Sequence, residues 1–176
     1  MGSASAANPA AAISTVFVYG SLLADDVVRV LLNRVPPSSS AILHDYQRFS
    51  IKGRVYPAIL PAENKKVIGR VLIGITPPEL HILDEFEDNE YERKTVNVFL
   101  QDTAEKLQAY TYVWENKTDP NLHGEWDFEE WKILHKDYFL KMTKGFKEEM
   151  KLPDSNTRVA TYESFYEGKD SGPPHS

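Results

Sequence analysis

Short apolar runs separated by turn-forming residues occupy the first half of the chain. Residues 16–19 are β-branched or aromatic and stop at Gly20 and Ser21, which predicts a buried strand ending in a turn. A short helix should follow, because Asp25 and Asp26 suit its first turn and apolar residues then recur at helical spacing. Further strands are expected at residues 41–43, 46–51, 56–60 and 66–75. The pattern indicates a meandering sheet with one inserted helix.

A capping box gives the strongest local signal in the chain. Thr76 suits the N-cap, Pro77 the first helical position, and Glu79 the position whose side chain reaches back to the cap. A helix is therefore predicted to begin here. Two strands should follow it as a hairpin, at residues 91–100 and 107–115.

The last helical pattern begins at Asp127 and places apolar residues on one side. These residues are Trp131, Leu134, Tyr138, Met142 and Phe146. About six or seven strands, mostly hairpin-linked, and about three helices predict an α+β fold: a small mixed or antiparallel barrel-like sheet with flanking helices and a long C-terminal helix. Residues 15–150 are expected to form this domain, after a disordered leader (1–14) and before a flexible polar tail (151–176).

Composition narrows the classes of function. The chain has 176 residues, no cysteine, and 20 Lys and Arg against 26 Asp and Glu, for a net charge of −6. Without cysteine, thiol catalysis, thiolate metal sites and disulfides are excluded. An acidic balance without a basic block argues against nucleic acid as a partner, and no apolar run is long enough to span a membrane. We expect a cytoplasmic protein of undetermined oligomeric state.

One acidic residue of the capped helix is a candidate for catalysis. At about 100° per residue, Glu87 falls in the sector bounded by Leu80 and Leu83. A carboxyl group beside a buried stripe loses hydration, which raises its pKa and suits it to general acid or base catalysis near neutral pH. The alternative is that the helix stops by Phe86 and that Glu87 is a solvated acid at its end. Helical geometry alone leaves both interpretations open.

The turn after the first predicted strand is a candidate anion site. Gly20 allows a sharp turn, and successive backbone N–H groups before a helix can bind an anionic group. A strand that ends in Gly-Ser is also a common plain turn. Other chemistry fits less well: Ser21 lacks the nucleophile elbow of serine hydrolases, and the five histidines contain no close pair of metal ligands.

Several segments, taken together, resemble a known family. Residues 16–22 (VFVYGSL), 83–87 (LDEFE) and 91–96 (YERKTV) resemble the gamma-glutamylcyclotransferase superfamily. Residues 112–114 (YVW) and 124–131 (GEWDFEEW) are similar to its plant AIG2-like branch, named for induction by an avirulence gene. The segments occur in the family's order, and the resemblance spans most of the chain.

The resemblance implies a six-stranded barrel whose Tyr-Gly-Ser loop holds a small γ-glutamyl substrate, with Glu87 as the catalytic acid or base. The substrate loop it implies is Tyr19, Gly20, Ser21, Leu22, Leu23 and Ala24. In such a substrate the α-amine attacks the γ-carbonyl and closes the ring of 5-oxoproline, so neither a metal nor another cofactor is needed. Whether the substrate is a γ-glutamyl amino acid, an amine or a larger conjugate stays open.

Two residues depart from the family pattern. Asp88 follows the implied catalytic glutamate, where many members have glycine. Leu22 follows Tyr-Gly-Ser, where many members with free-amino-acid substrates have asparagine. We expect a γ-glutamyl cyclotransferase; the alternatives are a barrel that serves as a non-catalytic ligand-binding or defence-response module, and a hydrolase that releases glutamate.

Overall fold

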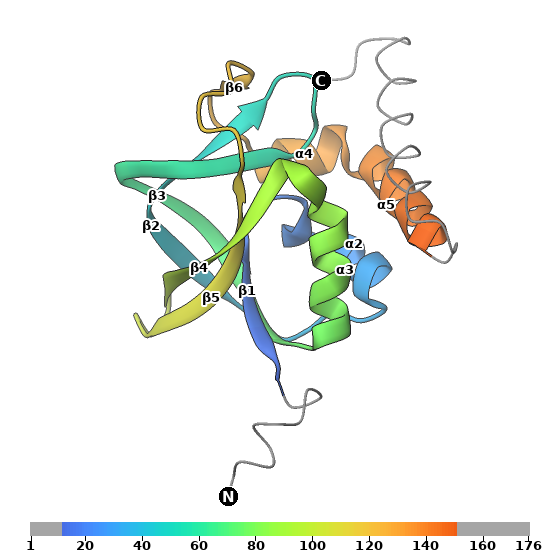
Figure 1. Cartoon of the computed structure of the whole chain (residues 1–176), viewed down its shortest axis with the longest axis horizontal. Coiled ribbons are helices and arrows are strands. Elements are labelled where there is room, and N and C mark those ends of the chain that lie inside the picture. The colour runs from blue at the N-terminus through green and yellow to red at the C-terminus, as the bar shows by residue number, and fades with distance from the viewer. Residues whose placement is uncertain (1–11, 151–176) are drawn as a thin grey trace, which may run out of the picture.

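The chain folds into a closed barrel with helices on one side (Figure 1), in a computed structural model that describes residues 12–150. Five strands close the barrel: β1 (Ser14–Val18), β2 (Ser38–Ile51), β3 (Pro57–Ile75), β4 (Tyr91–Leu100) and β5 (Lys106–Trp114). Their order is β3-β1-β5-β4-β2, and β2 pairs again with β3. A short strand, β6 (Leu122–His123), extends the sheet beyond β2. The predicted barrel-like α+β fold is confirmed.

Helices connect the strands and cover the barrel. Strand β1 is followed by the turn η2 (Ser21–Leu23) and helix α2 (Asp25–Leu32). Strands β3 and β4 are joined by helix α3 (Pro77–Glu87) and the turn η3 (Asp88–Glu90). The described chain ends with helices α4 (Phe128–Leu134) and α5 (Lys136–Met150). The predicted capping box is present, since Thr76 and Glu79 each accept a hydrogen bond from the other's backbone N–H. This cap fixes where α3 begins and therefore which way its last residue faces.

The strands predicted at 41–43 and 46–51 are one continuous strand, β2, which pairs antiparallel with an equally continuous β3. The pairing shifts register at a single irregularity beside Asp45. Asp45 and Asn64 both have left-handed φ angles, and the N–H of Asn64 donates to the Asp45 carboxylate (3.1 Å). Asp and Asn tolerate this conformation, so the polar break is a bulge within a long ladder rather than a turn.

The single helix predicted from Asp127 is broken in two at His135. Asp127 does cap α4, accepting hydrogen bonds from two N–H groups of its first turn. Leu134, predicted on the apolar side, is 60% exposed, whereas Phe139 of α5 is buried. The break turns α5 so that the rings of Trp131 and Phe139 pack edge to face, with centroids 5.6 Å apart.

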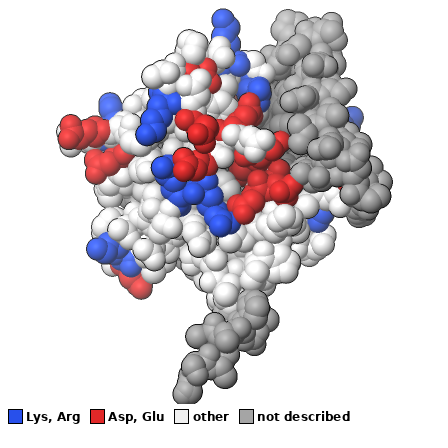
Figure 2. Space-filling model, viewed as in Figure 1, with Lys and Arg blue, Asp and Glu red and all other residues white. Residues whose placement is uncertain are grey.

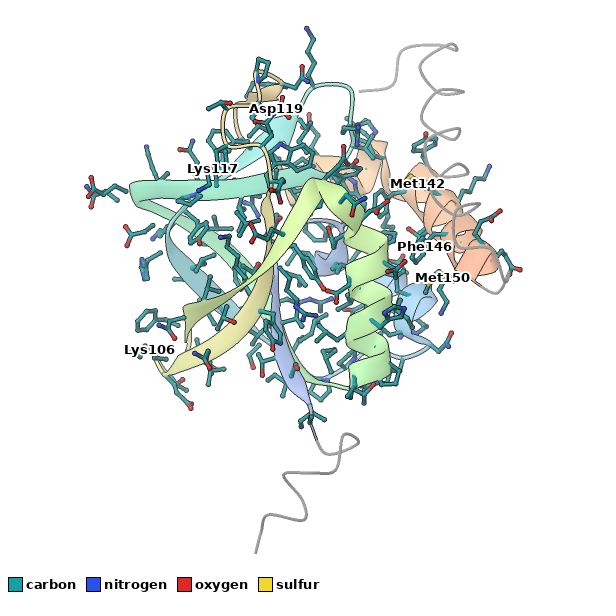
Figure 3. The ribbon with its side chains drawn as sticks, viewed as in Figure 1. Lys106, Lys117, Asp119, Met142, Phe146 and Met150 are labelled. Carbon is teal, nitrogen blue, oxygen red and sulfur yellow. The ribbon has the colours of Figure 1, made fainter. Side chains whose placement is uncertain are left out.

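Helix α5 packs on α3 through aromatic contacts. The Phe86 ring of α3 lies edge to face against Phe139 and Phe146 of α5, with centroids 5.9 and 5.1 Å apart. Met142 and Phe146 lie along the side of α5 that faces α3 (Figure 3). These contacts hold the C-terminal half of α3 between the barrel and α5.

Two segments for which the sequence made a prediction lie outside the residues that the structure describes. These are the predicted tail at 151–176 and residues 1–11 of the predicted leader. The last leader residue, Ser14, begins β1. Within residues 12–150, no helix is both long and apolar enough to cross a membrane.

Gly69 allows β3 to approach β1 closely. A Cβ at this position would overlap the carbonyl oxygen of Val18 and lie 2.9 Å from the Phe17 ring. Both neighbours are buried in the barrel core, so neither can move aside easily.

We expect Gly69→Ala to lower the free energy of unfolding by roughly 2 kcal/mol or more, because the added methyl group overpacks the core. Urea unfolding measures this change. Gly145→Ala is the matched control: its Cβ would meet nothing within 4 Å, and alanine in helix α5 should stabilise by up to ~1 kcal/mol. Equal stability of Gly69→Ala and the wild-type protein would contradict the close approach.

Candidate active site

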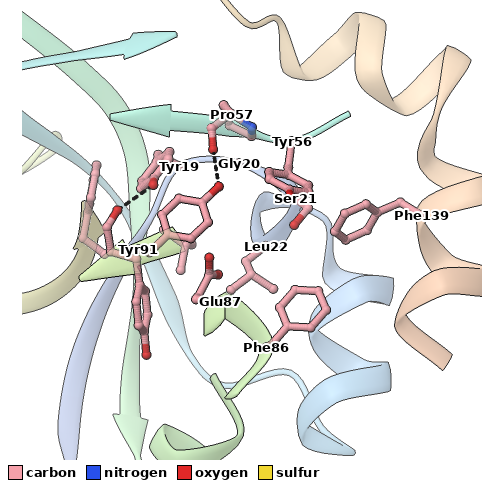
Figure 4. A pocket seen from close by; sticks show the side chains of 13 residues that line it. Tyr19, Gly20, Ser21, Leu22, Tyr56, Pro57, Phe86, Glu87, Tyr91 and Phe139 are labelled. Atoms are coloured by element: carbon pink, nitrogen blue, oxygen red, sulfur yellow. Dashed lines mark hydrogen bonds between the residues drawn. The ribbon is translucent and has the colours of Figure 1, made fainter. Parts of the chain in front are cut away.

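A cavity lies where the turn after β1 meets the C-terminal end of α3 (Figure 4). Aromatic residues from distant parts of the chain form much of its wall: Phe17, Tyr19, Tyr56, Phe86, Tyr91, Tyr112 and Phe139. Its volume is about 40 Å³, room for a few water molecules, since one water needs ~10–15 Å³ on this measure. Among the described residues that line the cavity, Glu87 alone carries a carboxyl group.

Gly20 brings the turn after β1 against the start of β3. A Cβ on Gly20 would lie 2.8 Å from two ring carbons of Pro57, so a larger residue would push the turn away from the cavity. Pro57 is itself held in place, because the hydroxyl of Tyr91 donates to its carbonyl oxygen (2.7 Å; dashed line in Figure 4).

The turn has three successive backbone N–H groups available to a ligand. Leu23 N–H donates to the Gly20 carbonyl (2.9 Å) and Ala24 N–H to the Ser21 carbonyl (3.1 Å), so these two are used within the turn. The N–H groups of Gly20, Ser21 and Leu22 donate to no other residue within the described part of the chain. These three residues line the cavity, but Leu23 and Ala24 of the implied substrate loop do not.

Tyr19 lines the cavity with its hydroxyl already engaged. The hydroxyl donates to the carbonyl oxygen of Tyr112 (2.6 Å; Figure 4). Burial, followed by the charge of Glu87, keeps the pKa of Tyr19 well above its ordinary value. Tyr19 therefore stays neutral and serves as a fixed wall of the cavity.

Glu87 is the last residue of α3, and its carboxyl group points into the cavity (Figure 4). Loss of hydration, reinforced by the nearby carboxylates of Asp84 and Glu90, raises the pKa of Glu87 to about 8. Glu87 keeps some accessible surface, as expected of a cavity-lining residue, while the surrounding rings displace most of the water. Within residues 12–150 no group donates a hydrogen bond to this carboxyl. Its place in the cavity lining and its raised pKa, rather than the position at the end of the helix alone, favour the desolvated acid over the solvated one.

Asp84 belongs to a hydrogen-bonded group on one side of Glu87. Its carboxylate accepts from the Arg93 guanidinium and from the Tyr112 hydroxyl, both at 2.7 Å. Acidic and basic side chains are interspersed over the face that α3 and β4 present in Figure 2. Because Arg93 neutralises Asp84 only in part at such an exposed pair, the negative charge of Asp84 still reaches Glu87.

A second group surrounds Glu90 at the other side. The Glu90 carboxylate accepts from the Arg54 guanidinium (2.8 Å) and the Tyr56 hydroxyl (3.0 Å). Arg54 also donates to the Tyr56 hydroxyl. Since Tyr56 is part of the cavity wall, this group links the cavity lining to the segment between β2 and β3.

Asp88 adopts a backbone conformation typical of glycine, with φ 59° and ψ −159°. A residue other than glycine pays on the order of 1–3 kcal/mol in this region. The conformation of Asp88 is thus one that a glycine would adopt without this cost, and the aspartate strains the chain here.

Sequence patterns did not identify the aromatic wall. Tyr56, Tyr91 and Phe139 come from three distant segments and share no motif. Tyr91 opens the segment 91–96 that resembles the family, but the resemblance assigns it no role, and the aromatic character of all three is shared by many core residues. Within residues 12–150, no group of three His, Asp or Glu side chains is arranged to hold a metal ion.

Comparison with known proteins places this barrel in a class. A mouse AIG2-like protein shares the fold, with a TM-score of 0.52 at 21% identity, over 65% of this chain and 88% of that one. A solution structure of an Arabidopsis thaliana protein has a TM-score of 0.62 at 49% identity, over 81% of this chain and 95% of that one. The architecture is that of γ-glutamyl cyclotransferase-like barrels.

Sequence comparison is more specific. The model of the family described as "Gamma-glutamyl cyclotransferase, AIG2-like" matches residues 16–132. The chain is 66% identical over 142 residues to AIG2-like protein D of Arabidopsis thaliana, covering 80% of this chain and 93% of that protein. The chain belongs to the gamma-glutamyl cyclotransferase, AIG2-like family.

The raised pKa predicts a pH-dependent difference in stability between the wild-type protein and Glu87→Gln. The pKa of Glu87 is 4.5 as an ordinary glutamate and about 8 in the folded protein. Between these values the unfolded chain holds the group ionised while the folded protein holds it protonated. Wild-type stability should therefore fall relative to the variant as pH rises from about 4.5 to about 8, and the difference should level off above that range.

Urea unfolding of both proteins across this pH range measures the effect. Glu85→Gln, which removes a carboxyl group from the same helix but outside the cavity lining, is the control. If the free energy of unfolding changed with pH in the same way for Glu87→Gln and the wild-type protein, the carboxyl group of Glu87 would not be desolvated.

Proposed function

We propose that this protein is a γ-glutamyl cyclotransferase, which converts a small γ-glutamyl compound into 5-oxoproline and a free amine or amino acid. The observation that carries the proposal is the Glu87 carboxyl group, with a pKa of about 8, in a cavity also lined by the turn at Gly20, Ser21 and Leu22. The γ-glutamyl class of substrate is the one for which the family is named.

The reaction needs one group that both removes and returns a proton. The ionised Glu87 carboxylate takes a proton from the substrate α-ammonium, and the freed α-amine attacks the γ-carbonyl carbon. The C–N bond that closes the five-membered ring forms, and the protonated Glu87 gives its proton to the leaving nitrogen. The ionised Glu87 then takes the second proton from the ring nitrogen as the bond from the carbonyl carbon to the leaving nitrogen breaks. Glu87 passes this second proton to the departing amine, which is released as an ammonium ion, and Glu87 is ionised again. A pKa near the working pH keeps both forms of Glu87 populated, which suits this double role.

Binding must fold the glutamyl chain back on itself. The free N–H groups of Gly20, Ser21 and Leu22 are suited to hold the α-carboxylate, which places the adjacent α-ammonium near Glu87. The aromatic wall packs against the methylene groups as the substrate displaces the cavity water. Holding this intramolecular geometry supplies up to ~7–11 kcal/mol of the barrier reduction.

We expect the purified protein to release 5-oxoproline from γ-glutamyl amino acids or amines. Glu87→Gln should lower kcat by roughly 10²–10⁴-fold with little change in KM, because it removes a proton-transfer group and keeps the shape of the cavity. In the wild-type protein, kcat/KM should rise with pH as Glu87 ionises, with an apparent pKa of about 8.

Glu85→Gln is the matched control and should retain turnover. Release of glutamate in place of 5-oxoproline would identify a hydrolase. Absence of turnover, together with thermal stabilisation by γ-glutamyl compounds, would identify a non-catalytic binding module. Either result would overturn the proposal.

A further inference from the structure

Two arginines contact the turn after β1, one from strand β2 and one from strand β3. Arg48 of β2 donates from Nη1 to the carbonyl oxygen of Tyr19 (2.9 Å), and Arg70 of β3 donates from Nη2 to the carbonyl oxygen of Leu22 (2.8 Å). Their side chains are only 18% and 15% exposed. Neither arginine lines the cavity, so both reach the turn from outside it.

Both guanidinium groups are anchored independently of the turn. Arg48 also donates to the Ile68 carbonyl (3.3 Å) and lies over the Trp126 ring, 5.7 Å from its centroid. Arg70 pairs with the carboxylate of Asp25 (2.7 Å). These contacts fix the position of each guanidinium group, which in turn fixes the carbonyl of the turn that it binds.

Arg48 fixes the direction of one N–H group that is open to a ligand. The Tyr19 carbonyl and the Gly20 N–H belong to the same peptide group, and in a trans peptide these two point in opposite directions. No peptide bond in residues 12–150 is cis. Holding the Tyr19 carbonyl on Arg48 therefore turns the Gly20 N–H away from the guanidinium.

Arg70 acts on the next N–H group through one more hydrogen bond. The Leu22 carbonyl that it binds shares a peptide group with the Leu23 N–H, and that N–H donates to the Gly20 carbonyl (2.9 Å). The Gly20 carbonyl in turn shares a peptide group with the Ser21 N–H. The chain of contacts from Arg70 thus ends at the Ser21 N–H, which donates to no other described residue.

A charged donor on a carbonyl polarises the whole peptide group. Hydrogen bonds to a guanidinium are stronger than neutral ones, and successive bonds in a chain strengthen one another by ~10–30% each. The small exposure of both side chains limits screening by water. The Gly20 and Ser21 N–H groups should therefore be both better oriented and better donors than those of an ordinary turn.

We propose that Arg48 and Arg70 are positioning residues that orient and polarise the Gly20 and Ser21 N–H groups for the α-carboxylate of the substrate. The proposal deepens the proposed function and rests on it. It assigns to two arginines outside the cavity a share of the affinity for the glutamyl end of the substrate, with no part in the proton transfers.

Binding of 5-oxoproline, which carries the carboxylate and cannot react further, tests the proposal by calorimetry. We expect Arg48→Met to raise the Kd for 5-oxoproline and the KM for a γ-glutamyl substrate by roughly tenfold each, with kcat changed less than about threefold. Arg70→Met should act in the same direction. Arg48→Lys keeps a cationic donor and should recover part of the loss, which a purely steric role would not allow.

Arg34→Met is the matched control. Arg34 also donates to a backbone carbonyl, that of Gly74 (2.9 Å), and pairs with Glu79 at the other end of α3 from Glu87. Its removal should lower the thermal midpoint and leave Kd and KM unchanged. Thermal unfolding of every variant separates a loss of fold from a loss of positioning.

Unchanged Kd and KM in a folded Arg48→Met protein would overturn the proposal, as would a fall in kcat at unchanged Kd. An Arg48→Lys protein as weak in binding as Arg48→Met would also count against it. The wild-type protein tests the proposed function separately. If it bound 5-oxoproline but turned over no γ-glutamyl substrate, the proposed ring closure would be contradicted. The Kd values of the wild-type protein and the arginine variants for 5-oxoproline would still decide the role of the arginines.

Discussion

The scarcity of water around one carboxyl group is the constraint on which this site depends. Glu87 ends helix α3 inside a cavity whose wall is largely aromatic, and its pKa rises to about 8 because the ionised form loses hydration there. The carboxylates of Asp84 and Glu90, each tied to its own arginine, add to this effect. A glutamate held in this way can exchange a proton near neutral pH, which an ordinary surface glutamate cannot do.

The rest of the fold serves to bring a backbone turn to this carboxyl group. Closure of β3 onto both β1 and β2 places Pro57 against Gly20, and only a residue without a side chain allows that contact. Strands β2 and β3 also supply the two arginines that hold the turn from outside. Helix α5, packed on Phe86 through its own phenylalanines, keeps the end of α3 in place. Acid, donors and apolar wall thus come from segments far apart in the chain.

Local chemistry explains which parts were predictable from the sequence. The capping box fixed the start of α3, and helical phase then placed Glu87 beside the apolar stripe, where the structure has it. The break at His135, the exposure of Leu134 and the aromatic wall depend on contacts between distant segments, which periodicity does not encode. Leu23 and Ala24 were assigned to the substrate loop by resemblance, but their N–H groups are used within the turn, a detail that only the hydrogen bonds reveal.

Titration of the Glu87 side chain itself tests the central claim most directly. In protein labelled with ¹³C at the glutamate carboxyl carbons, the signal that disappears in Glu87→Gln can be assigned and followed against pH. A midpoint near the pKa of about 8 is the result that the desolvated cavity requires. A midpoint at the ordinary glutamate value of 4.5 would mean that water reaches the carboxyl group freely, and the proposed proton transfers would lose their basis.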